Sequence, residues 1–299
     1  MSYAPSGEQY AIHDSGYSAV VTEVGATLRE LRHGDRPLVA GFDASELRPL
    51  YRGALLAPWP NRISDGTYSF EGARHSVAIN EPDRANALHG LVSWVPWRLV
   101  RLDGHEVSLA YRLFPQDGYP FQLDLAVTYT LSGDGLHCVL TAENSGVSAA
   151  PYGCAPHPYL VAGEGKVDDW TLELPADRYL DVTPDRLLPK SVRDVEGTRF
   201  DFRAPRRIGG TALDHAYTGF TRREVRVTAP EGTGVAIAWG ESSPWLQVHT
   251  ADRPEPEFDR VALAVEPMTC PPDAFTTRVD LVVLQPGDRH EATWTISAL

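Results

Sequence analysis

Residues 121–144 read FQLDLAVTYTLSGDGLHCVLTAEN. Apolar side chains alternate with mostly polar ones from Phe121 to Leu131, and the alternation resumes from Leu136 to Leu140. A period of two is typical of a strand that buries one face. The SGDG sequence between the two runs has the composition of a turn. This stretch therefore predicts a β-hairpin.

The same pattern recurs along the chain. Apolar residues alternate over 107–113, over 225–227 and 235–237 on either side of a turn, and over 279–283 before PGD. Helical periodicity is scarce, and the 25 Gly and 24 Pro are spread as punctuation between short strands. We therefore predict an all-β fold, a large antiparallel β-sandwich, with residues 1–299 as a single domain and no internal repeat.

Composition narrows the class of partner. The formal net charge of −13 repels phosphate backbones and anionic membranes, which argues against nucleic acid and membrane partners and favours a neutral ligand. The first residues lack the pattern of a signal peptide, and no apolar run reaches the roughly 18 residues that span a bilayer. We expect a cytoplasmic protein.

Metal and cofactor signals are missing from the sequence. Cys138, Cys154 and Cys270 are far apart and show no CxxC spacing, so neither a disulfide framework nor a zinc site is indicated. No glycine-rich phosphate loop, GxSxG elbow or HExxH motif occurs. We expect no metal and no cofactor.

Two polar, turn-rich stretches interrupt the strand pattern early in the chain. In 57–72, APWPNRISDGTYSFEG, the fork of Arg62 suits two ligand oxygens, although a pairing with a nearby acid would also explain it. In 80–94, NEPDRANALHGLVSW, Asn80, Asn86 and His89 cluster around turn residues. The asparagines could also cap turns, and we expect Trp94 and the following Trp97 to fill the core.

Two later stretches carry the titratable candidates. In 155–160, APHPYL, His157 lies between two prolines that restrict its backbone, which suits a group that must be aimed. A packed turn histidine is the simpler alternative. In 261–275, VALAVEPMTCPPDAF, Glu266 directly follows an apolar run. Burying a carboxylate costs free energy, so its position there suggests a functional role.

Asp214 in LDHAYTGF and Gln247 in PWLQVHTA complete the candidate set. Each could equally be a plain turn or strand residue. Together with Arg62, His89, His157 and Glu266, they match a hydroxyl-rich, uncharged ligand such as a sugar. A His and a Glu form an acid–base pair unlike the two carboxylates of glycoside hydrolysis. Opening and reclosing of a sugar hemiacetal needs such a pair and no metal.

Five of these segments, in order from residue 60 to 275, resemble the aldose 1-epimerase (galactose mutarotase) family. They are PNRISDGTYSFEG, NEP…NALHGLV, HPYL, LDHAYTG and AVEPMTCPPDAF. The resemblance implies a large antiparallel β-sandwich with the sugar in an open cleft. It implies that His157 is the general acid and Glu266 the general base that interconvert the α and β anomers of a free aldose. Arg62, His89, Asp214 and Gln247 would then contact the sugar.

The chain departs from the family pattern at Leu91, where familiar members have a second glycine after LHG. We expect this leucine to alter the cleft wall, so galactose is not carried over as the substrate. Two alternatives stay open. A hexose-6-phosphate 1-epimerase would need positive charge, for which Arg52, Arg74 or Arg84 would have to serve because the lysines are only Lys166 and Lys190. A non-catalytic sugar-binding module would not need the acid and base.

Overall fold

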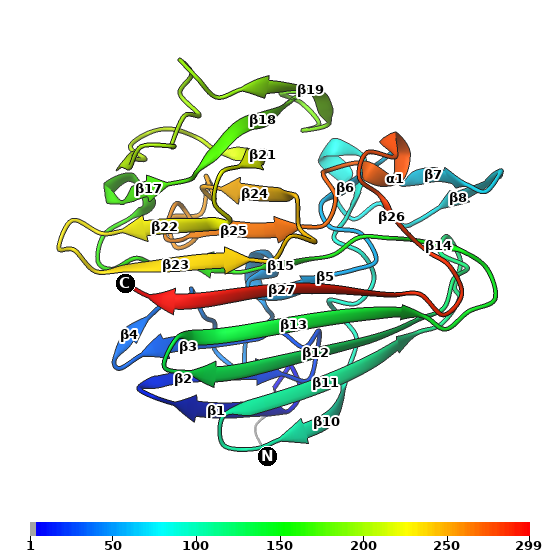
Figure 1. Ribbon diagram of the computed structural model, residues 1–299, viewed down its shortest axis with the longest axis horizontal. Helices are drawn as coiled ribbons and strands as arrows, with labels where there is room; N and C mark the ends of the chain where they lie inside the picture. Colours follow the sequence, from blue (N-terminus) through cyan, green and yellow to red (C-terminus); the bar gives the residue numbers. More distant parts are fainter. Residues whose placement is uncertain (1–3) are drawn as a thin grey trace.

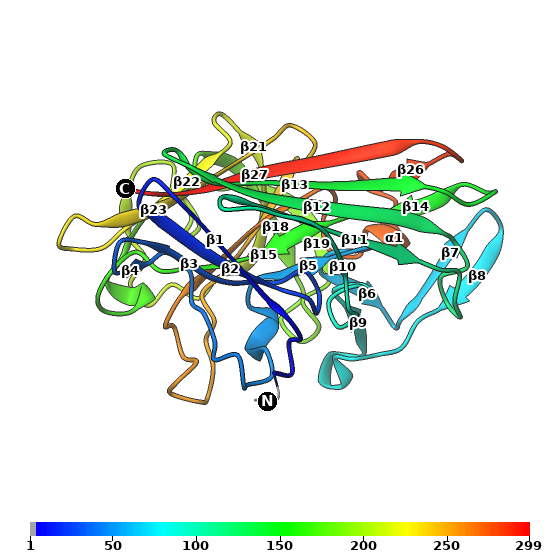
Figure 2. The ribbon, with the colours of Figure 1, turned by 90° about the horizontal axis from the view of Figure 1, so that it is seen from below.

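The computed structural model describes residues 4–299. Its strands pair antiparallel into a nine-stranded sheet, a six-stranded sheet, a four-stranded sheet and several two-stranded ladders. The large sheet forms one layer, and the six- and four-stranded sheets lie across the core from it (Figures 1 and 2). The predicted all-β antiparallel sandwich is confirmed.

The nine-stranded sheet contains the hairpin predicted from residues 121–144. Leu125, Val127 and Tyr129 point into the core, and the residues between them point outward. In spatial order the strands are β10 (Arg98–Leu102), β11 (Glu106–Leu113), β12 (Leu123–Ser132), β13 (Gly135–Asn144), β27 (Arg289–Ala298), β23 (Gly234–Trp239), β22 (Glu224–Thr228), β17 (Thr171–Glu173) and β20 (Arg206–Arg207). The late strand β27 thus fills the gap between β13 and β23 (Figure 1).

The six-stranded sheet has one face on the core and one face turned away from it. Leu246, Val248 and Val265 belong to the main core cluster, whereas Gln247 and Glu266 alternate with them and point to the opposite face. In spatial order the strands are β16 (Tyr159–Leu160), β25 (Leu263–Met268), β24 (Trp245–His249), β21 (Asp214–Phe220), β18 (Ala176–Val182) and β19 (Pro189–Asp194).

The remaining elements are short. The four-stranded sheet packs β1 and β2 against β11, β12 and β13, and it comprises β1 (Gln9–Asp14), β2 (Tyr17–Thr22), β3 (Leu28–His33) and β4 (Arg36–Pro37). The two-stranded ladders are β5 (Ala54–Leu56) with β15 (Ala155–His157), β6 (Arg62–Ser64) with β9 (Asn86–Leu88), β7 (Thr67–Phe70) with β8 (Ala73–Ser76), and β14 (Ala150–Tyr152) with β26 (Val282–Leu284). The helical turns are α1 (Ala274–Thr277) and the 3₁₀ turns Pro49–Tyr51, Pro82–Arg84 and Val167–Asp169.

The strand predicted over 279–283 is wrong in its first half. Residues 279–281 lie outside any strand, and β26 covers only Val282–Leu284. Arg278 and Asp280 both have positive φ, 67° and 47°, as the chain leaves α1. Two left-handed residues so close together prevent an extended conformation, although the apolar residues alternate.

Two further findings concern the chain as a whole. Cys138, Cys154 and Cys270 are free and buried. Within residues 4–299, no helix has the length and apolar character needed to span a bilayer.

Candidate active site

A cleft of about 520 Å³ lies over the outer face of the six-stranded sheet. Strands β21, β24 and β25 form its floor, and three polar segments of the first hundred residues form its walls. The wall segments include the 3₁₀ turn Pro49–Tyr51, the start of β6 and the stretch 80–94. All six candidate residues predicted from the sequence line this one cleft: Arg62, His89, His157, Asp214, Gln247 and Glu266.

Strand register brings three of the candidates together. Gln247 on β24 lies directly opposite Glu266 on β25. Asp214 begins β21, the neighbour of β24, and Gln247 Nε2 donates a hydrogen bond of 2.6 Å to Asp214 Oδ1. Since alternate residues of a strand share a face, these side chains project into the cleft while their neighbours pack in the core.

His157 stacks with two tyrosines. Its ring is nearly parallel to Tyr51, with centroids 6.4 Å apart and planes at 19°, and to Tyr159, with centroids 5.1 Å apart and planes at 17°. Nε2 of His157 lies 3.4 Å from Oε1 of Glu266. The backbone of the residue is fixed by its pairing in β15 with Ala54 of β5. The imidazole is therefore aimed at the carboxyl group.

Arg62 is oriented by an acid that the sequence analysis passed over. Its Nε and one terminal nitrogen donate to the two carboxylate oxygens of Glu81 at 2.9 and 3.0 Å. Asn86 Nδ2 also donates to Glu81, at 2.9 Å. The same guanidinium lies 3.9 Å from Asp214 Oδ2. Arg62 thus pairs with a nearby acid and also faces the cleft, so both of its sequence-based interpretations hold in part.

His89 occupies a strained backbone position. Its φ is +64°, in a region that non-glycine residues rarely adopt and that concentrates at functional sites. The ring packs edge-on against Tyr51, with centroids 4.6 Å apart, and against His157, with centroids 5.2 Å apart. Burial, with the nearby charges of Arg62 and Arg48, lowers the pKa of His89 to about 3. His89 is therefore a neutral ring at physiological pH.

The His157–Glu266 pair is buried, at 5 % and 2 % exposure. Burial lowers the pKa of His157 well below its ordinary value, and the neighbouring histidines His89 and His249 add to the effect. Burial also raises the pKa of Glu266 well above its ordinary value, reinforced by Asp214 and opposed by Arg62. Both shifts favour the uncharged forms, so at a pH between the two pKa values the pair holds one exchangeable proton.

Several buried polar atoms in the cleft have no hydrogen-bond partner among residues 4–299. They include His89 Nδ1, His157 Nδ1, Gln247 Oε1 and Glu266 Oε2. Buried polar atoms are costly to leave unpaired, so a cluster of them in one cleft points to a polar ligand. The hydroxyl groups of a sugar are partners of this kind.

The structure adds side chains that sequence reasoning missed. Tyr51, Glu81, Trp94 and His249 all line the cleft. Trp94 was expected in the core, but it is 52 % exposed and covers the guanidinium of Arg48 at 4.2 Å, whereas Trp97 is buried as expected. Only Glu81 left a sequence signal, because it is an acid next to Asn80 and close to Asn86 in a stretch already singled out.

The expected influence of Leu91 on the cleft wall is wrong. Leu91 is not among the residues that line the cleft, and it packs partly buried against the main core. Its amide donates to the carbonyl of Ala57 at 2.7 Å. Of the three arginines considered for a phosphate, only Arg84 lines the cleft, where it pairs with Glu81 at 3.2 Å.

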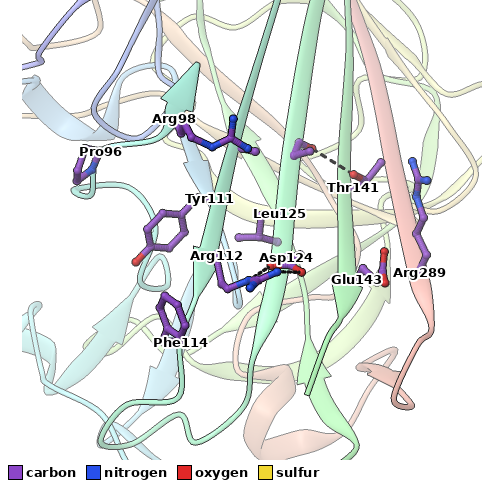
Figure 3. Close-up of a pocket in the computed structure, with 12 residues that line it drawn as sticks. Pro96, Arg98, Tyr111, Arg112, Phe114, Asp124, Leu125, Thr141, Glu143 and Arg289 are labelled. Carbon is purple, nitrogen blue, oxygen red and sulfur yellow. Dashed lines mark hydrogen bonds and ion pairs between the residues drawn. The ribbon is translucent and has the colours of Figure 1, made fainter. Parts of the chain in front are cut away.

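A second hollow, of about 740 Å³, lies on the outer face of the nine-stranded sheet (Figure 3). Two of its charged groups pair with each other, since Arg112 donates to both oxygens of Asp124, at 2.5 and 2.8 Å. Among residues 4–299, no side chain that lines this hollow has a buried polar atom without a hydrogen-bond partner. We therefore take the smaller cleft as the candidate active site. Within the same residues, no group of three or more His, Cys, Asp or Glu side chains could hold a metal ion.

The fold and this cleft define a β-sandwich protein of the galactose mutarotase-like class. Among solved structures, the GalM/aldose epimerase homologue of Caenorhabditis elegans superposes with a TM-score of 0.86 at 24 % identity, over 98 % of this chain and 99 % of the other. The chain belongs to the aldose 1-epimerase family, whose sequence profile matches residues 8–297. It is accordingly an isomerase with a mutarotase-type function.

Two relatives illustrate the range of the family. The uncharacterized protein YihR of Escherichia coli (strain K12) is 33 % identical over 97 % of this chain and 93 % of its own length. The galactose mutarotase of Homo sapiens is 31 % identical over 72 % of this chain and 67 % of its own length. The family resemblance inferred from five short motifs is thereby confirmed.

Proposed function

We propose that the protein interconverts the α and β anomers of a free aldose, with His157 and Glu266 as the acid–base pair. The observation that carries this proposal is the 3.4 Å contact between His157 Nε2 and Glu266 Oε1 in a cleft rich in unpartnered polar atoms. A proton donor and a proton acceptor side by side, next to hydroxyl-binding groups, are what hemiacetal opening requires.

The reaction proceeds by two proton transfers in each direction. The carboxylate of Glu266 takes the proton of the anomeric hydroxyl while the imidazolium of His157 gives a proton to the ring oxygen, and the bond from C1 to the ring oxygen breaks. Rotation about the C1–C2 bond presents the other face of the aldehyde. Glu266 then returns its proton to the carbonyl oxygen as the ring hydroxyl attacks C1 and loses its proton to His157. Each positioned transfer contributes roughly 10²–10⁴-fold.

The proton count of the pair fits this cycle. Burial favours protonated Glu266 and neutral His157 in the free protein. Transfer of that one proton across the 3.4 Å contact gives the carboxylate and imidazolium that the first step uses. The charge of Arg62 favours the carboxylate form of Glu266. Each turnover then ends with the proton on the same group as at its start.

The other candidates would hold the sugar. Burial opposes the charged form of Asp214, but the neighbouring His249 and Arg62 and the hydrogen bond from Gln247 lower its pKa, so its carboxylate accepts hydrogen bonds from hydroxyls. Gln247 has a free Oε1 and neutral His89 a free Nδ1 among residues 4–299, and Arg62 supplies donors beside them. The relatives named galactose mutarotase support a free aldose as the substrate class.

One observation favours a second candidate, a hexose-6-phosphate 1-epimerase. Arg253 lines the cleft, and within residues 4–299 its guanidinium forms no ion pair, so it could receive a phosphate. Against this, Asp83 and Asp252 line the same cleft and repel an anion.

Polarimetry tests the proposal. Freshly dissolved α-D-glucose, α-D-galactose and other aldoses are followed with and without the protein, beside a hexose 6-phosphate in a coupled assay. Faster approach to anomeric equilibrium with a free aldose supports the proposal. Acceleration with the phosphate alone favours the second candidate. Sugar binding without acceleration of any sugar would leave a binding module and overturn the catalytic proposal.

A further inference from the structure

His249 lies in the cleft but has no part in the proton transfers proposed above. It ends β24, two residues beyond Gln247 and on the same face, and its side chain is 17 % exposed. In the register of the sheet it stands between Asp214 of β21 and Ala264 of β25. Tyr159 of β16 pairs in turn with Ala264, so only the short alanine side chain stands between His249 and Tyr159 in this register.

The contacts of His249 decide which ring nitrogen faces the cleft. Nδ1 lies 3.2 Å from the carbonyl oxygen of Leu213, and a carbonyl oxygen can only accept a hydrogen bond. Nδ1 therefore carries the proton, and it lies 3.9 Å from Asp214 Oδ2 as well. On the neutral ring, Nε2 is then an acceptor. Within residues 4–299, no donor is hydrogen-bonded to Nε2.

The surroundings of the ring also favour an acceptor for a neutral donor. Arg62 lies 3.9 Å from Oδ2 of Asp214, the same oxygen that faces Nδ1 of His249, and His89 and His157 are neutral for the reasons given above. A sugar hydroxyl held by Asp214 would lie one strand away from the imidazole. A neighbouring hydroxyl of the same ring would then come within reach of Nε2.

We propose that His249 is a further substrate-binding residue, whose Nε2 accepts a hydrogen bond from a sugar hydroxyl next to the one held by Asp214, and so helps to select the aldose. This inference rests on the proposed function. A site that hydrogen-bonds a hydroxyl discriminates against analogues that lack it, because its own polar group is then left unpaired.

Two substitutions separate this role from a structural one. His249→Asn keeps a donor near the position of Nδ1, where it can still bond the Leu213 carbonyl, but it removes the atom at Nε2. His249→Gln reaches the position of Nε2 with its amide oxygen but gives up the contact with Leu213. We expect the Asn variant to raise KM about tenfold with kcat changed less than threefold, and the Gln variant to recover most of that loss. The reverse order, or equal losses with a lowered Tm in both, would overturn the proposal.

A panel of monodeoxy aldoses identifies the hydroxyl. Wild-type protein should lose kcat/KM on the sugar that lacks the contacted hydroxyl, and His249→Asn should lose no more on that sugar than it has already lost. Equal further losses on every sugar in the panel would mean that His249 touches none of these hydroxyls.

The same variants keep the inference separate from the proposed function. If wild-type protein accelerates no free aldose but binds one in calorimetric titration, the proposed function fails, and the Kd values of the two variants still test the contact. A Kd about tenfold weaker for Asn than for Gln supports it, and equal Kd values contradict it.

Discussion

At the scale of single residues, the pair His157 and Glu266 is the first target for mutation. We expect His157→Ala and Glu266→Gln each to lower kcat by at least about 10²-fold, because each removes one proton transfer. Sugar binding should persist, since Asp214 and Gln247 are untouched. Polarimetry gives the rate and calorimetric titration the affinity, with circular dichroism as the control for folding. A variant that retains near wild-type kcat would refute the role of its residue.

The orientation of Arg62 by Glu81 allows a double-mutant cycle. Glu81→Gln removes the charge that holds the guanidinium fork through two bonds of 2.9 and 3.0 Å. We expect Glu81→Gln to lower kcat/KM about tenfold and Arg62→Ala to lower it further. On the Arg62→Ala background, Glu81→Gln should have almost no additional effect. Independent, additive losses would mean that Glu81 acts on the site by some other route.

The proton shared by the pair predicts a broad pH optimum. On acidification the pair gains a second proton, on His157, and the rate falls. The lowered pKa of His157 places this acid limb of the pH–rate profile well below pH 6.5. On alkalinisation Glu266 loses the shared proton, and its raised pKa places that limb well above pH 4.5. The rate of wild-type protein, corrected for the uncatalysed reaction, should therefore be flat between these two limbs.

Asp214→Asn provides the sign test for this profile. The carboxylate of Asp214 raises the pKa of Glu266 by repulsion, so its removal favours the charged form of Glu266. The alkaline limb of kcat should move to lower pH. A limb that stays in place or moves upward would show that Glu266 is not the group titrating there.

At the scale of elements, the strands were predicted where local pattern and tertiary role agree. The hairpin of β12 and β13 follows from alternation because one face is buried and the other exposed along its whole length. The failure over 279–281 has a physical cause, since the left-handed residues Arg278 and Asp280 end the extended conformation without a glycine to reveal them.

The candidate site divides in the same way. His157 and Glu266 could be found because prolines and an apolar run make them unusual in the sequence. Tyr51, Trp94 and His249 could not be found, because their place in the cleft depends on how the loop at 48–52, the stretch 80–94 and strand β24 meet in three dimensions. The roles of the six predicted residues stay predictions until the variants are measured.

The turn that carries His89 should tolerate little change. Gly90 has φ +72°, and a Cβ atom placed on it would lie 2.0 Å from the carbonyl oxygen of Ala57. We expect Gly90→Ala to lower the free energy of unfolding by at least about 2 kcal/mol, from left-handed strain and steric overlap together. Urea denaturation measures this, with Gly104→Ala as the matched control, since a Cβ there meets nothing within 4 Å. Equal effects of the two substitutions would contradict the steric argument.

At the scale of the whole molecule, the buried histidines should reduce stability in acid. The pKa of His89 falls from 6.5 to about 3 on folding, so below pH 6.5 the unfolded chain binds a proton that the folded protein does not. Stability is therefore lost as the pH falls from about 6.5, before most carboxylates titrate. His89→Asn, which tolerates the left-handed backbone, should flatten the loss between pH 6.5 and 4.5 in urea denaturation. An unchanged slope would mean that His89 does not cause the loss of stability.

The same denaturation curves test the prediction that residues 1–299 form a single domain, which should unfold in one transition.

The position of β27 also bears on how the protein is made. Strands β13 and β23 each keep one open edge until residues 289–298 have left the ribosome, because only β27 joins them. During synthesis the open edges of β13 and β23 are therefore available for pairing with other nascent chains. We expect the yield of native protein in the cell to depend on chaperones that shield these edges until translation reaches the last strand.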